Sequence, residues 1–259
     1  MIALIRYTFA TVLHTQRYLA PVLLFTGLLG VLTVNGSGPL PPAYASSAGA
    51  LFLCATWLTV ALMSLDDPAQ RAVMVVTSGR SLRVLLAGIA TTLLSCLPLL
   101  AFGLFFPLWM GSYDVRPVDF LLGIEAQITC ALAGTAIGVL CSRLVFRRQG
   151  YALGAALALV MVAVFTHDLP PVNRLFRLMA TSSDSRELLV PAGGMLVVAA
   201  AVLTACTALT QYIAARKDWA ADAPRRPPSS RSGRRVTPIR PARGRGSART
   251  PRCGRSSAA

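Results

Sequence analysis

The chain has 259 residues, of which 54% are hydrophobic and only 14% are charged, and its formal net charge is +15. In a soluble domain about a quarter of the residues are charged, so this composition excludes an ordinary water-soluble protein. The positive charge does not indicate a nucleic-acid partner, because residues 218–259 hold eleven arginines and two aspartates and the other basic residues fall in short loops.

Long runs of the sequence contain no charged residue. They cover residues 18–65, 84–113, 126–142, 149–166 and 188–215. A helix needs roughly 20 apolar residues to cross a hydrocarbon core about 30 Å thick. None of these runs alternates at period two, as a barrel strand would. We therefore predict an all-α integral membrane protein.

The apolar runs and the residues that break them predict a bundle of about six transmembrane helices within residues 1–217. The predicted spans are residues 18–34, 43–65, 84–110, 120–142, 151–166 and 188–213. Pro98 and Pro107 are expected to kink the third span, because each removes a backbone hydrogen bond. The fifth span is the shortest.

The N-terminal segment predicts a helix that lies in the membrane interface before the first span. Its apolar residues share one helical face: Ile2, Ile5, Phe9, Val12 and Leu13. The alternative is that the first span begins early. Ala43-Tyr44-Ala45 resembles a signal-peptide cleavage site, but the preceding apolar run is too long and ends too far from it.

The distribution of Lys and Arg among the connections predicts the orientation. One side of the predicted bundle collects 21 of these residues and the other only 4. Basic residues concentrate in cytoplasmic loops, so both termini are predicted to be cytoplasmic. The Arg-, Pro- and Ser-rich tail 218–259 has the composition of disorder. This tail either attracts anionic lipid, or fixes the topology and does nothing else, or results from a shifted reading frame.

The connection at residues 66–83 has the pattern of a short capped helix. Asp67 is a good helix cap and Pro68 suits the first helical position. Ala69, Ala72, Val73 and Val76 then form an apolar stripe that Gly79 ends. Such a helix either docks in a groove of a soluble partner or rests on the membrane surface.

Glu125 is the only ionisable residue well inside a predicted span. It lies either on a route for substrate or ions, or it is a protonated or hydrogen-bonded carboxyl that joins helices near the outer boundary. Gly134-x-x-x-Gly138 and Gly150-x-x-x-Gly154 have the spacing that permits close helix packing.

The sequence contains no motif for catalysis or for a cofactor. The nucleotide loop G-x-x-x-x-G-K-[ST], the zinc pair H-E-x-x-H and the nucleophile elbow G-x-S-x-G are missing. No pair of the six cysteines has the spacing of metal ligands, and five of them fall in apolar runs. We expect no enzymatic activity, no metal and reduced cysteines.

Over residues 1–217 the layout resembles the membrane subunit of type-2 ATP-binding-cassette (ABC) exporters, particularly short actinobacterial ones. The resemblance rests on the interfacial segment 2–17, the six spans and the stretch from Asp66-Asp67-Pro68 to Gly79-Arg80. It implies that residues 66–83 carry the helix that touches the ATPase. The implied coupling residues are Asp66, Asp67, Pro68, Arg71, Gly79 and Arg80. Unlike longer members, the chain shows no obvious re-entrant hairpin between spans five and six, where residues 169–187 are polar.

The resemblance implies a permease subunit in a bacterial plasma membrane. Its partners would be a separate ATPase subunit, which binds the ATP, and a second permease subunit, identical or different. Two alternatives stay open. An ATP-independent transporter or channel subunit predicts inverted repeats and several buried charges, of which we find only Glu125. A membrane assembly protein that transports nothing requires neither inverted repeats nor buried charges.

Overall fold

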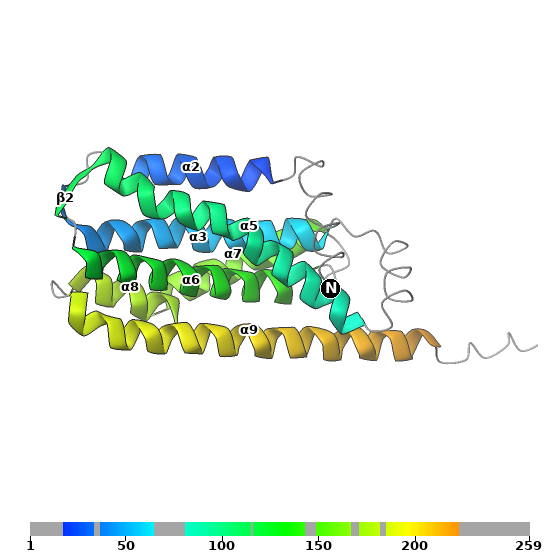
Figure 1. The fold of residues 1–259 in the computed structure, drawn as a ribbon. Helices are drawn as coiled ribbons and strands as arrows, with labels where there is room; N and C mark the ends of the chain where they lie inside the picture. Colours follow the sequence, from blue (N-terminus) through cyan, green and yellow to red (C-terminus); the bar gives the residue numbers. More distant parts are fainter. Residues whose placement is uncertain are drawn as a thin grey trace, which may run out of the picture. The chain divides into compact units, whose positions relative to one another are not determined.

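The computed structural model describes residues 18–33, 37–64, 81–114, 116–142, 149–166, 171–181 and 185–222. These residues are almost entirely helical (Figure 1). Their elements are α2 Leu19–Thr33, β1 Ser37–Pro39, α3 Leu40–Met63, α5 Ser81–Met110, β2 Ser112–Asp114, α6 Pro117–Leu140, α7 Gln149–Phe165, α8 Val172–Thr181 and α9 Ser185–Asp222. All described residues except Asp222 belong to one compact unit, Met1–Ala221.

Four helices in the described part of the chain are long and apolar enough to cross a membrane. They are Leu40–Met63, Leu82–Met110, Pro117–Leu140 and Glu187–Ala214, which correspond to α3, most of α5, α6 and most of α9. Helices α2 and α7 are also apolar but shorter, with 15 and 17 residues. This confirms the prediction of a helical protein with several helices that could span a membrane.

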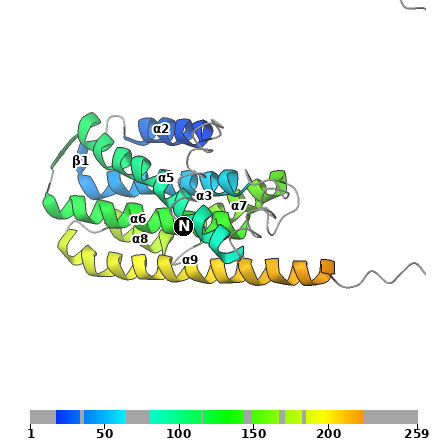
Figure 2. The ribbon, with the colours of Figure 1, turned by 45° about the vertical axis from the view of Figure 1, so that its right-hand side comes forward.

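Helix α3 occupies the core of the unit. It contacts α2, α5, α6, α7 and α8, and its contact with α6 is the most extensive. Figure 1 and Figure 2 both show α3 beside α5 and α6. The α3–α6 contact is close because Gly134 and Gly138 of α6 lie against the backbone and side chains of α3. The other predicted small-residue motif packs against no described residue, since a methyl carbon on Gly150 or Gly154 would have no neighbour within 4 Å in the described part of the chain.

A short pair of strands joins two connections that are far apart in the sequence. Strand β1 precedes α3, strand β2 precedes α6, and the two pair in parallel, with Ser37 opposite Ser112 and Pro39 opposite Asp114. The α2–α3 and α5–α6 connections therefore lie at the same end of the unit. The predicted orientation requires these two connections to share a side.

Several predicted boundaries were wrong. Helix α3 begins at Leu40 rather than at residue 43, so Pro41 and Pro42 lie in its first turn. Proline is tolerated there because the first backbone N–H groups of a helix have no intrahelical acceptor. Helix α9 also extends beyond the predicted sixth span, residues 188–213, and continues to Asp222.

The connection at residues 169–187, which we predicted to be polar, contains a helix that we did not predict. Residues Val172–Thr181 form the amphipathic helix α8. Val172, Leu175 and Met179 are buried in the main core cluster, whereas Arg174 and Arg177 are exposed. The buried residues are spaced three and four apart, so one helical face is apolar even though the segment as a whole is polar.

Candidate functional site

The predicted coupling residues lie outside the described part of the chain. They are Asp66, Asp67, Pro68, Arg71, Gly79 and Arg80, which all fall within residues 65–80. The predicted interfacial helix at residues 2–17 and the tail beyond 222 also lie outside it. Their roles stay predictions.

Glu125 lies on α6 and is half-buried. The hydroxyl of Thr129, one turn along the helix, donates to the main-chain oxygen of Glu125 at 2.7 Å. Its carboxylate atom Oε2 is buried and has no hydrogen-bond partner among the described residues. A buried carboxyl in an apolar helix is costly, so Glu125 stays a candidate for a functional role.

The structure reveals a buried polar contact that we did not predict from the sequence. Gln127 of α6 is completely buried, and its Nε2 donates to Ser47 Oγ of α3 at 2.8 Å. Ser47 Oγ in turn donates to the main-chain oxygen of Tyr44 at 3.1 Å. The tyrosine hydroxyl and Gln127 Oε1 are buried without a partner among the described residues. This contact fixes the register of the two central helices.

Replacing Ser47 by alanine is expected to destabilise the bundle more than replacing both members of the pair. The single change leaves the Gln127 amide nitrogen buried without an acceptor, which costs about 1–3 kcal/mol. The double variant S47A/Q127L lacks both polar groups, so most of that loss should be recovered. Thermal unfolding in detergent measures the difference. S46A is the matched control, because Ser46 Oγ donates within its own helix. Equal destabilisation of S47A and S47A/Q127L would contradict this prediction.

Helices α7 and α8 pack against different halves of α3. Ala152 and Ala156 of α7 share a buried cluster with Val60, near the C-terminal end of α3. The ring of Phe176 in α8 lies against Gly49, in the N-terminal half of α3. Helix α7 is about 25 Å long at 1.5 Å per residue, so it is shorter than a hydrocarbon core. The two helices together therefore extend along α3 as one interrupted helical path.

Asn173, in the first turn of α8, links this helix to the end of α7. Its Nδ2 donates to the main-chain oxygen of Val164, in the last turn of α7. The last four carbonyl groups of a helix have no intrahelical donor, so this bond satisfies one of them inside the bundle. Asn173 Oδ1 is buried and has no partner among the described residues.

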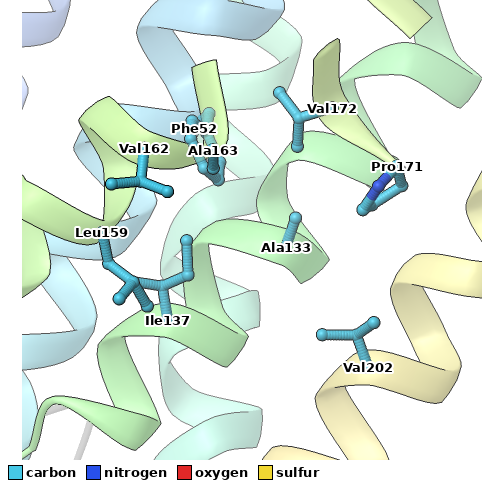
Figure 3. A pocket seen from close by; sticks show the side chains of 9 residues that line it. All are labelled: Phe52, Ala133, Ile137, Leu159, Val162, Ala163, Pro171, Val172 and Val202. Carbon is cyan, nitrogen blue, oxygen red and sulfur yellow. The ribbon is translucent and has the colours of Figure 1, made fainter. Parts of the chain in front are cut away.

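A cavity of about 190 Å³ lies beside the interruption (Figure 3). Phe52 of α3 and Ala133 and Ile137 of α6 form one part of its wall. The remaining side chains come from α7, the start of α8 and α9: Leu159, Val162, Ala163, Pro171, Val172 and Val202. Among the described residues, the lining side chains are all hydrocarbon and include no acid, base or nucleophile, and Glu125 and Gln127 are not among them. This arrangement suits the binding of apolar groups.

Comparison with protein-family models, curated proteins and solved structures gives no match for this chain. Within the described residues, no group of three His, Cys, Asp or Glu side chains could hold a metal ion. The five cysteines in that part of the chain are free, and four of them are buried. We therefore take the interrupted path α7–α8 and the cavity beside it as the candidate functional site. The sequence signal that could have revealed α8 is the i, i+3, i+7 spacing of Val172, Leu175 and Met179.

Proposed function

We propose that the chain is the permease subunit of an ABC-type exporter, which forms the membrane pathway and is driven by a separate ATPase subunit. The observation that supports the proposal is the interrupted helical path α7–α8 beside a cavity, in a unit that holds four helices long and apolar enough to cross a membrane. Transporters commonly build their binding sites where a transmembrane helix is discontinuous. Polar atoms freed by such an interruption are tolerated where they lie inside protein, and the bond from Asn173 to Val164 satisfies one of them here.

The proposed topology has six crossings in a bacterial plasma membrane. Helices α2, α3, α5, α6 and α9 each cross once, and α7 with α8 makes the fifth crossing. An even number of crossings brings both termini to one side, which the excess of arginine marks as the cytoplasm. Many outward side chains are apolar, among them Leu97 and Trp109 of α5 and Val197 of α9, as contact with lipid requires.

In this mechanism two permease subunits form the pathway at their interface. An ATPase dimer closes on ATP and pushes the helix at residues 66–83, which shifts the spans between inward and outward states. ATP drives the change because it binds the closed ATPase more tightly than the open one. Glu125, with a buried carboxylate oxygen, is the candidate residue on the substrate route.

The test is to co-express the full chain with an ABC ATPase encoded beside its gene and purify it in mild detergent. We expect the ATPase to co-purify in equal amounts and to hydrolyse ATP faster with the permease than alone. Purification of the folded chain without any ATPase would contradict the proposal. Solute uptake by vesicles that contain this chain alone would favour an ATP-independent transporter instead.

A further inference from the structure

The cavity beside the α7–α8 interruption lies midway along two helices that are long and apolar enough to cross a membrane. Phe52 is near the middle of α3, Leu40–Met63, and Val202 is near the middle of the apolar stretch Glu187–Ala214. The middle of a spanning helix lies roughly 15 Å from either boundary of the hydrocarbon core. Water is scarce at that depth, so the surrounding medium is lipid hydrocarbon.

The rim of the cavity faces outward. Phe52 and Ala133 at its inner wall are buried, whereas Leu159, Val162 and Val202 are 39%, 56% and 37% exposed. Figure 3 shows these side chains around one space, with Val162 and Leu159 on one side and Val202 across from them. The exposed rim residues are apolar, so the opening adjoins the lipid-facing surface of α7 and α9.

We infer that this cavity binds the end of an acyl chain from a membrane phospholipid. An apolar cavity of about 150 Å³ stays dry and can bind benzene, so a hydrocarbon site of about 190 Å³ has room for several methylene groups. An empty cavity would also forfeit the dispersion contacts of its lining side chains. A flexible chain end that enters from the surrounding lipid supplies those contacts without desolvating any polar group.

The test uses the full chain in vesicles of phosphatidylcholine and phosphatidylglycerol. A trace of phosphatidylcholine carries a photoactivatable diazirine near the end of one acyl chain, and mass spectrometry locates the cross-links. We expect the cross-links to concentrate on residues 159–163 and on Phe52. A163L places a larger side chain in the cavity and should reduce these cross-links severalfold. The matched control A200L makes the same change at an exposed position of α9 and should leave them unchanged.

A second variant keeps the test informative if A163L does not fold. L159A removes side-chain volume at the rim, so it should preserve or increase labelling of Phe52. Circular dichroism and size-exclusion elution establish that each variant is folded. Cross-links spread evenly over the outward faces of α5, α7 and α9, or equal labelling in A163L and A200L, would overturn the inference. Cross-links between two copies of the chain at this site would also overturn it, because a protein partner would then cover the cavity. The readout is lipid binding, so it does not depend on the proposed coupling to an ATPase.

Discussion

The double charge reversal R71E/R80E is expected to abolish co-purification of the ATPase. Both arginines belong to the connection at residues 66–83, one in the first turn of its predicted helix and one just after Gly79, which ends that helix. If this helix docks in a groove that is complementary to its positive charge, each reversal replaces an attraction by a repulsion. Like-charge contacts across an interface cost several kcal/mol. A loss of about 3 kcal/mol already weakens binding about a hundredfold, so the ATPase should be lost during purification.

Two controls separate docking from insertion and from general charge effects. R147E/R148E makes the same charge change in another connection on the same predicted side and should retain the ATPase. R71K/R80K keeps the charge and should retain it as well. Reporter tags at residues 35–42 and 70–79 should appear in opposite compartments in the parent and in R71E/R80E alike. Unchanged ATPase recovery with R71E/R80E would remove the coupling role from this helix.

Much of the fold could be predicted from the sequence because the lipid imposes a strong local constraint. A span must avoid ionised groups over its whole length, and this property can be read without knowing any partner helix. The centres of the four described helices that are long and apolar enough to cross a membrane were therefore predicted closely. The ends were predicted less well, since Pro41 and Pro42 interrupt an apolar pattern without preventing a first helical turn.

The candidate site could not be predicted in the same way, because it depends on which helices are neighbours. The contact of Gln127 depends on Ser47, which lies 80 residues earlier on a different helix. The cavity likewise collects side chains from five elements between Phe52 and Val202. Helix α8 was missed for a different reason. Arg174 and Arg177 interrupt its apolar residues, so it contains no charge-free run, and only the spacing of Val172, Leu175 and Met179 reveals an apolar face.

The Gly134 and Gly138 pair provides the sharpest test of the α3–α6 packing. A methyl carbon on Gly134 would lie 2.6 Å from the main-chain oxygen of Phe52, and one on Gly138 would lie 2.4 Å from Thr59 Cβ. Backbone cannot move aside as a flexible side chain can, so the helices would have to separate. Overpacking of this kind costs about 1–3 kcal/mol per site. G134A/G138A is therefore expected to unfold at a markedly lower temperature in detergent.

The chain contains its own matched control for that variant. Gly150 and Gly154 have the same four-residue spacing within an apolar helix, but a methyl carbon on either would meet no atom of the described residues within 4 Å. Alanine in an open helical position is more stable than glycine by about 0.5–1 kcal/mol. G150A/G154A should therefore unfold at the same or a higher temperature than the parent. The same substitution would thus lower the melting temperature at one glycine pair and not at the other. Equal melting temperatures for the two double variants would mean that α3 and α6 do not meet through Gly134 and Gly138. The register fixed by Gln127 and Ser47 would then also be wrong, because both features belong to the same helix–helix contact.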